Sequence, residues 1–182
     1  MSKDLEETLI SKEHVFDGQL LKVRKDTVLL PNGKEAVREW IQHPGAVAVV
    51  PILEDGRIVM VKQFRYPVGK ITLEIPAGKL DKGEDPDKCA LRELKEETGY
   101  TPKTIKKLTT IGTTMAFSNE VIHLYVAEGL IEGEQCLDED EFLHVEKYEV
   151  EEIKKMIQEE QIYDAKSLVA ILMTLNRKDK MV

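Results

Sequence analysis

The chain of 182 residues is 42% hydrophobic and 33% charged, so it is long and apolar enough to form one domain with a full core. Its 26 basic and 34 acidic residues give a formal charge of −8, which excludes the basic surface of a nucleic-acid binder. No signal peptide or membrane span is apparent, and the isolated cysteines Cys89 and Cys136 are against a zinc site or a disulfide framework. We therefore expect a cytoplasmic protein.

Apolar residues alternate on both sides of the turn sequence Pro31-Asn32-Gly33-Lys34, which predicts a β-hairpin between residues 19 and 43. Two apolar runs rich in β-branched residues follow at 46–53 and 58–64, separated by an Asp-Gly turn, and these are predicted to be core strands. A short strand is expected over residues 71–75. The N-terminal part of the chain is therefore predicted to be rich in β-structure.

A helix is predicted from Pro86, with Asp85 as its N-cap, to the residue before Gly99, which is a typical C-terminal glycine. The elements expected after it are strands over 105–112, 121–127 and 142–145 and helices over about 149–160 and 164–176. Because strands and helices do not alternate steadily, the pattern favours an α+β layered fold over a doubly wound parallel sheet.

Three carboxylates are predicted to lie close together on this helix. At about 100° per residue, Glu93 and Glu97 share one face and Glu96 lies beside them. Like charges at this spacing cost a few tenths of a kcal/mol per pair, which a hard divalent cation would offset. Oxygen ligands favour Mg²⁺ or Mn²⁺, whereas the alternative is a solvated acidic face. The apolar face is predicted to be Ala90, Leu91 and Leu94.

Residues 78–100 match the pattern G-x5-E-x7-R-E-U-x-E-E-x-G-U at every fixed position, namely Gly78, Glu84, Arg92, Glu93, Leu94, Glu96, Glu97, Gly99 and Tyr100. This pattern is the Nudix box, so the chain resembles the Nudix hydrolases. The resemblance implies an α/β/α sandwich of mixed sheets, with an N-terminal antiparallel hairpin or sheet. It also implies that Glu93 and Glu97 bind Mg²⁺ together with the carbonyl of Ala77, that Glu96 shares in the cluster, and that Arg92 orients the carboxylates.

The reaction that the resemblance implies is metal-assisted attack of water on a pyrophosphate, which releases two monophosphates. A carboxylate outside the box is expected to take the proton of the water. The acidic segment 137–141 offers Glu139 and Glu141 for this role, and the sequence does not choose between them. The alternative for this segment is a solvated loop without a catalytic role.

Three further segments, 43–50, 61–65 and 74–80, resemble the ADP-ribose pyrophosphatase branch of the family. This resemblance implies hydrolysis of ADP-ribose to AMP and ribose 5-phosphate. Arg65 would then contact the phosphates, a role that suits a bidentate cation, and its alternative is a surface ion pair. Gly78 and Glu120 are candidate substrate contacts, with Glu120 near the terminal ribose.

The same resemblance divides the chain into an N-terminal β region, 1–43, for dimerisation and adenine contacts, and a Nudix hydrolase domain, 44–182. The expected assembly is a homodimer, and a hairpin alone has too little partner sheet to be stable. The candidate N-terminal contacts are Phe16, Arg38, Glu39 and Trp40. The two aromatic residues in this set are equally candidates for the core.

One segment departs from the branch pattern. Met115 and Ala116 stand where the branch has Pro-Gly, so the loop has more conformational freedom and a flexible apolar side chain. Substrate preference is therefore open, and the alternatives are another nucleoside diphosphate derivative, such as a nucleotide sugar or a dinucleotide. A non-catalytic, nucleotide-sensing Nudix module is the alternative of another class, and the complete set of box glutamates favours the enzyme.

Overall fold

In the computed structural model, residues 3–178 are described, and the chain divides into two compact units. The first, here called the N-terminal unit, comprises Met1–Gly45 and Gly112–Val121. The second, here called the core unit, comprises Ala46–Ile111 and Ile122–Val182. Each unit is described by itself. Within residues 3–178, no helix is both long and apolar enough to cross a membrane.

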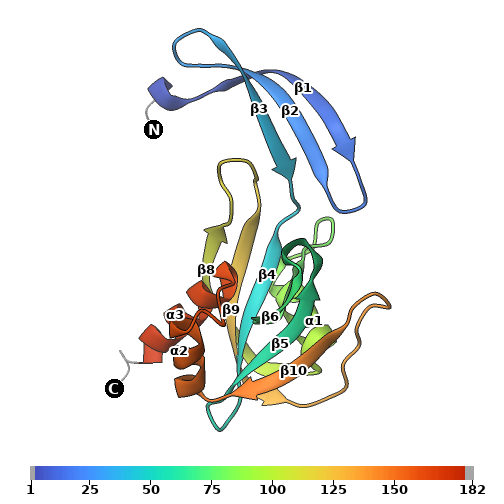
Figure 1. The fold of residues 1–182 in the computed structure, drawn as a ribbon, viewed down its shortest axis with the longest axis vertical. Helices are drawn as coiled ribbons and strands as arrows, with labels where there is room; N and C mark the ends of the chain where they lie inside the picture. The colour runs from blue at the N-terminus through green and yellow to red at the C-terminus, as the bar shows by residue number, and fades with distance from the viewer. Residues whose placement is uncertain (1–2, 179–182) are drawn as a thin grey trace. The chain divides into compact units, whose positions relative to one another are not determined.

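The N-terminal unit contains a three-stranded antiparallel sheet, which follows a 3-10 helix at Lys3–Leu5. Its strands, in the order β1-β2-β3, are β1 (Thr8–Asp17), β2 (Lys22–Leu29) and β3 (Glu35–Gln42) (Figure 1). The predicted hairpin corresponds to β2 and β3, but the sequence did not predict β1. Two register shifts, one between Leu9 and Ser11 and one between His14 and Phe16, interrupt the alternation that would have revealed this strand.

The segment Gly112–Val121 belongs to the N-terminal unit because it is hydrogen-bonded to the end of β3. The backbone N–H of Ile41 donates to the carbonyl of Phe117 at 2.8 Å, and the N–H of His43 donates to Oδ1 of Asn119 at 2.7 Å. The loop that contains Met115 is therefore fixed to the N-terminal sheet, although it is distant from that sheet in sequence.

The core unit is built on a seven-stranded mixed sheet. Its central path is β10-β5-β4-β9-β8, with β6 paired to β5 and β7 paired to β4. The strands are β4 (Ala46–Ile52), β5 (Ile58–Arg65), β6 (Lys70–Glu74), β7 (Ala77–Lys79), β8 (Thr101–Gly112), β9 (Val121–Ile131) and β10 (Leu143–Tyr148). Strand β4 runs parallel to β9 and antiparallel to β5 and β7. The short β7, which contains Gly78, is the one strand of this sheet that the sequence did not predict.

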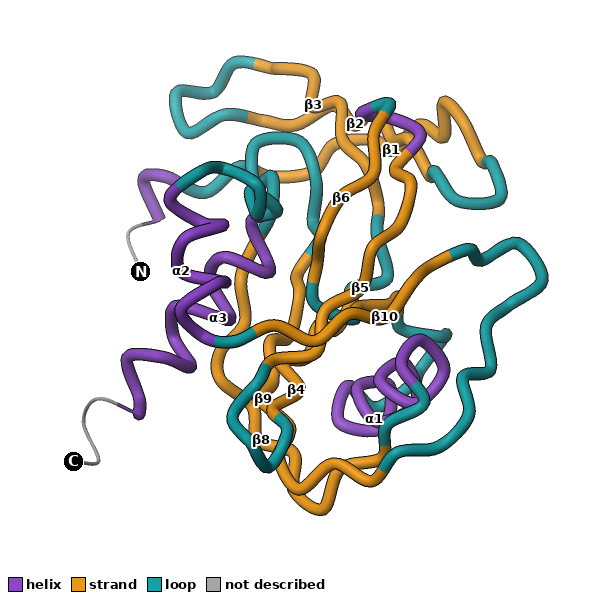
Figure 2. The backbone as a smooth tube through the Cα atoms, turned by 60° about the horizontal axis from the view of Figure 1, so that its bottom comes forward, coloured by secondary structure: helices purple, strands orange, loops and turns teal. Residues whose placement is uncertain are grey.

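Helices cover both faces of this sheet, as Figures 1 and 2 show. Val47 and Val49 of β4 pack with α1 (Pro86–Thr98), whereas the alternate residues Ala48 and Val50 face α2 (Val150–Gln158) and α3 (Ala165–Lys178). All residues of β4 are buried because both of its faces are covered. The predicted α/β/α layering is therefore confirmed.

The ends of α1 agree with the sequence prediction, but its faces do not. Oδ1 of Asp85 accepts hydrogen bonds from the first turn, and Gly99 ends the helix at φ 77°. Leu91, predicted on the apolar face, is 39% exposed. In contrast, Glu93 and Glu97 are only 9% and 4% exposed, because Glu97 lies about 20° from the buried Ala90 around the helix axis. The buried arc of α1 therefore includes the two glutamates.

Candidate active site

Arg92 joins three carboxylates of the box. Its Nε and Nη2 atoms donate to the two oxygens of Glu84, each at 2.9 Å, in a bidentate pair. Its Nη1 atom donates to Glu93 at 2.8 Å and to Glu96 at 2.9 Å. These charge-assisted bonds fix the directions of Glu93 and Glu96, which are three positions apart on α1. Arg92 is therefore hydrogen-bonded to three of the box glutamates at once.

Strand β7 brings the backbone of Ala77 and Gly78 against this cluster. The N–H of Ala77 donates to Oε2 of Glu97 at 3.0 Å. A Cβ atom at position 78 would overlap the carboxylate of Glu93, so only glycine lets the strand approach this closely. The backbone of β7 therefore lies against two carboxylates, and this close approach explains why the strand contains a glycine.

The two buried glutamates have elevated pKa values. Burial is the main reason why the pKa of Glu97 rises to about 8, and the charges of Glu93 and Glu141 add to the increase. Burial also raises the pKa of Glu93, against the attraction of Arg92. Both shifts show that negative charge is crowded and poorly solvated at this point. A divalent cation would relieve that crowding, and a set of carboxylate and carbonyl oxygens suits a hard one.

Within residues 3–178, no three His, Cys, Asp or Glu side chains are arranged so that they could hold a metal ion together. Arg92 lies between Glu93 and Glu96, which are both hydrogen-bonded to its Nη1 atom. The residues nevertheless fit a divalent metal by their chemistry. Glu93 and Glu97 are both buried carboxylates, and the charge of Glu93 acts on Glu97 and raises its pKa.

The acidic loop between β9 and β10 lies near the carboxylate cluster. Glu141 is close enough for its charge to raise the pKa of both Glu93 and Glu97. Its backbone N–H donates to the carbonyl of Asp138 at 3.0 Å, which closes a turn. Glu139, the other candidate base, lies within this turn. The structure therefore brings the acidic loop to the helix that contains the box glutamates.

Arg65 forms a bidentate ion pair with Glu74, with Nε at 2.9 Å and Nη2 at 2.7 Å from its oxygens. Glu74 is 3% exposed and also accepts a hydrogen bond from Lys166 of α3. Burial alone would raise the pKa of Glu74, but Arg65 and Lys166 together lower it to about 2. The charge of Glu97 in turn contributes to the elevated pKa of Arg65. Arg65 is thus in the neighbourhood of the carboxylate cluster, and two of its nitrogens are occupied by Glu74.

Sequence reasoning assigned no role to Glu74 or Lys166. The available signal for Glu74 was a charged residue at the end of a short apolar strand, directly before Ile75 and Pro76. The sequence offered no reason to single out Lys166, because the helix dipole disfavours a cation near the start of a helix. Asp164 offsets this effect: it accepts from Lys166 at 2.9 Å and from the backbone N–H of Ser167 at 3.0 Å.

The other candidate contacts lie in the N-terminal unit. Arg38 pairs with Glu7, and Nε1 of Trp40 donates to Asp26 at 2.9 Å. Phe16 is 55% exposed on β1 and is not a core residue of this unit. The remaining two candidates are Glu39, which is exposed on β3, and Glu120, which is paired with His43 and Thr113. The structure therefore gathers Phe16, Arg38, Glu39, Trp40 and Glu120 in one unit and the box residues in the other.

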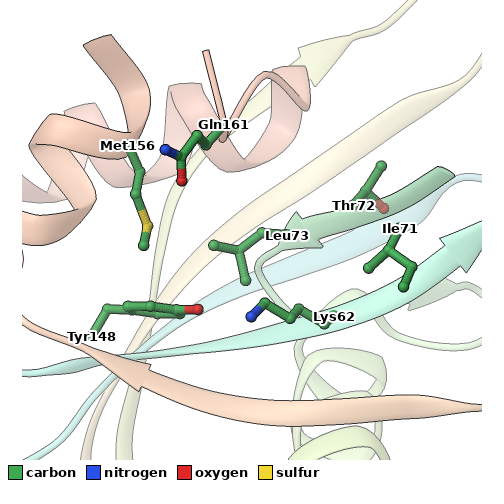
Figure 3. Close-up of a pocket in the computed structure, with 7 residues that line it drawn as sticks. All are labelled: Lys62, Ile71, Thr72, Leu73, Tyr148, Met156 and Gln161. Atoms are coloured by element: carbon green, nitrogen blue, oxygen red, sulfur yellow. The ribbon is translucent and has the colours of Figure 1, made fainter. Parts of the chain in front are cut away.

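A cavity of about 230 Å³ lies on the opposite side of the core sheet, next to α2 (Figure 3). It is lined by Lys62, Ile71, Thr72, Leu73, Tyr148, Met156 and Gln161. Its only cation, Lys62, is paired with Glu146 at 2.8 Å. Because Leu73 and Met156 belong to the apolar cluster under α2 and α3, this cavity is separated by the sheet from the carboxylates of α1.

A sequence profile of the NUDIX domain matches residues 42–168, and a profile described as the nucleoside diphosphate sugar hydrolase N-terminal domain matches residues 7–41. The chain belongs to the Nudix family, whose hydrolases use divalent metal cations. The family and enzyme class predicted from the box are thereby confirmed.

Over 171 residues, the chain is 47% identical to an ADP-ribose pyrophosphatase of Bacillus subtilis, which covers 93% of this chain and 92% of the relative. It is also 47% identical, over 173 residues and 94% of each chain, to a methanol dehydrogenase activator of Bacillus methanolicus. Among solved structures, the crystal structure of an ADP compounds hydrolase has a TM-score of 0.85 at 22% identity, covering 99% of this chain and 98% of that chain. This last similarity concerns the fold.

Proposed function

We propose that this protein hydrolyses the pyrophosphate bond of ADP-ribose, in a Mg²⁺-dependent reaction, to AMP and ribose 5-phosphate. The observation that supports the reaction is the buried pair of Glu93 and Glu97, oriented by Arg92 and β7 beside a base-carrying loop. The observation that supports the substrate is the 47% identity to an ADP-ribose pyrophosphatase over nearly the whole chain. Mn²⁺ is the second metal that these oxygen ligands would accept.

Glu93 and Glu97 would hold the metal together with the carbonyl of Ala77, while Glu96 completes the cluster and Arg92 holds the carboxylates in place. A bound divalent cation would neutralise the pyrophosphate oxygens and make a water more acidic. A carboxylate of the acidic loop accepts the proton of the attacking water. Glu141 is the better candidate than Glu139, because its charge acts on both buried glutamates.

Arg65 contacts a phosphate of the substrate through Nη1, the nitrogen that its bidentate pair with Glu74 leaves unused. Glu74 carries one negative charge and pairs with two cations, Lys166 and Arg65, so it does not fully neutralise Arg65. Arg65 therefore keeps positive charge, which attracts the phosphate. Gly78 supports the same site, since its lack of a side chain leaves room beside Glu93. The protein as a whole is acidic, and these local cations allow it to bind phosphates at this site.

The N-terminal region, residues 1–43, forms a homodimer and contacts the adenine, while residues 44–182 form the hydrolase domain. Every residue of β1 is exposed in the single chain, including Leu9, Ile10, Val15 and Phe16. A sheet of three strands with an apolar exposed edge is stabilised when a second copy covers it. Arg38, Glu39, Trp40 and Glu120 are the further substrate contacts. The cellular location is the cytoplasm.

A nucleotide sugar is the second candidate substrate. Two observations favour it: the N-terminal match is to a nucleoside diphosphate sugar hydrolase domain, and Met115, which replaces the proline of the branch, is 85% exposed. A flexible side chain in that loop leaves the size of the group beyond the pyrophosphate less restricted than a proline would.

Product formation from ADP-ribose, ADP-glucose, NADH, FAD and diadenosine polyphosphates, with and without Mg²⁺, tests both candidates. We expect the highest kcat/KM for ADP-ribose and no turnover after chelation of the metal. A preference for ADP-glucose would assign the enzyme to nucleotide sugars. Metal-independent turnover, or binding of all compounds without turnover, would refute the hydrolase assignment and favour a nucleotide sensor.

A further inference from the structure

The loop between β9 and β10, residues 132–142, is hydrogen-bonded to the C-terminal end of α1. The backbone N–H of Cys136 donates to the carbonyl of Glu96 at 3.0 Å. The side-chain amide of Gln135 donates through Nε2 to the carbonyl of Glu97 at 2.6 Å. Figure 2 shows the loop passing beside α1 on its way to β10. Two adjacent loop residues therefore hold the backbone of two adjacent glutamates of the metal-binding helix.

These bonds satisfy acceptors that the helix itself leaves open. The last four carbonyls of an α-helix have no partner within the helix. In α1, the N–H of Gly99 donates to the carbonyl of Lys95. The loop supplies the donors for the carbonyls of Glu96 and Glu97. Neither end of the contact has space for a side chain, because a Cβ on Gly99 would lie 2.5 Å from the carbonyl oxygen of Gly133. The loop and the helix end therefore form one closely packed element.

The position of Glu141 follows from this contact. Its N–H closes a turn with Asp138, which begins three residues after Gln135, and β10 begins directly after Phe142. The segment that contains Glu141 is thus fixed on one side by the end of α1 and on the other by the pairing of Leu143 with Gln63. We propose that Gln135 is a positioning residue, which holds the carboxylate of Glu141 at a fixed distance from those of Glu93 and Glu97.

The contact joins two acidic segments of the chain. The loop carries Asp138, Glu139, Asp140 and Glu141 directly after it, and the helix end carries Glu93, Glu96 and Glu97. A neutral amide at position 135 joins these segments without adding charge. A glutamate there would have a similar shape but could donate no hydrogen bond to the carbonyl of Glu97, and its charge would face the negative end of the helix dipole.

The inference rests on the proposed function, in which Glu141 is the base. A double-mutant cycle with Gln135→Ala and Glu141→Gln tests it, and Glu134→Ala, at the exposed neighbouring position of the loop, is the matched control. We expect Gln135→Ala to lower kcat by about tenfold and to change KM by less than about twofold, since misplacement of a reacting group by about 1 Å has effects of this order or larger. In the Glu141→Gln background, the same substitution should have almost no effect on kcat.

Two measurements on the protein without turnover complete the test. Amide hydrogen exchange of the metal-free protein should show faster exchange at Cys136 in Gln135→Ala, by roughly fivefold to tenfold, because one hydrogen bond contributes about 1 kcal/mol. Equilibrium binding of Mn²⁺ should be unchanged by this substitution. If the unsubstituted protein shows no turnover, the proposed function is refuted. Unchanged exchange, equal losses of kcat in both backgrounds, or full activity of Glu141→Gln would refute the positioning role of Gln135.

Discussion

Replacement of Glu74 by glutamine removes the charge at the centre of the buried network behind Arg65. Glu74 is 3% exposed, and its two oxygens are shared by the cations Arg65 and Lys166 and by the hydroxyl of Thr72. Glutamine has nearly the same volume, but its amide presents a donor to at least one cation. The substitution leaves Arg65 without its carboxylate partner and Lys166 with Asp164 alone. Breaking one side of a buried ionic group is costly because the remaining charges stay desolvated.

The pKa of Glu74 gives the magnitude of the effect. The folded protein lowers this pKa from 4.5 to about 2, so the ionised carboxylate contributes about 3 kcal/mol to the free energy of unfolding at pH 7. Because the folded pKa lies below the unfolded one, the contribution is fully present above about pH 4.5 and is lost as the pH falls towards 2. At pH 3, about half of it should remain.

Urea unfolding, followed by circular dichroism at pH 7 and pH 3, measures the difference between wild type and Glu74→Gln. We expect a loss of about 3 kcal/mol at pH 7 and a clearly smaller loss at pH 3. The control is Glu128→Gln, at an exposed position of β9, which should change the unfolding free energy by less than about 0.5 kcal/mol at either pH. A loss at Glu74 that is independent of pH, or below about 1 kcal/mol at pH 7, would contradict the ionic account of this network.

Three further predictions concern the candidate active site. Glu97→Gln should lower kcat by a hundredfold or more, to order of magnitude, while circular dichroism shows the same helix content, because glutamine is a comparable helix former; turnover near wild type would remove Glu97 from the metal ligands. Gly78→Ala should displace the carboxylate of Glu93 and weaken Mn²⁺ binding by roughly 10–100-fold in an equilibrium titration, and unchanged affinity would show that Glu93 does not bind the metal. Chelation with EDTA should abolish hydrolysis of ADP-ribose, and added Mg²⁺ should restore it; activity that survives chelation would contradict metal dependence.

The sequence by itself determined the family, the enzyme class and most of the local structure. The N-cap Asp85, the helix start at Pro86 and the terminal glycine Gly99 act within a few residues, so they define the helix without knowledge of the fold. The strands β4 and β5 were predicted for a similar reason, since a continuous apolar run that is bounded by turns is typical of a buried strand. The spacing of the box residues identified the family and predicted the site, because this spacing is a property of the chain alone.

The tertiary structure decided which side chains are partners. A helical wheel placed Glu93 and Glu97 on a polar face, but the position of the sheet decided that they lie on the buried arc beside Ala90 and that Leu91 is exposed. The strand β1 stayed hidden in the sequence because register shifts break its periodicity.

The contacts that join distant parts of the chain were likewise invisible in the sequence. Lys166 reaches Glu74 across 92 positions, and Gln135 reaches the carbonyl of Glu97 across 38. Neither spacing follows a local period, because such pairs arise only when the loop and the helices pack against the sheet. The sequence thus predicted which residues perform the chemistry. The packing of α1, α3 and the acidic loop decided how these residues are held, since burial and hydrogen-bond partners are properties of the folded chain.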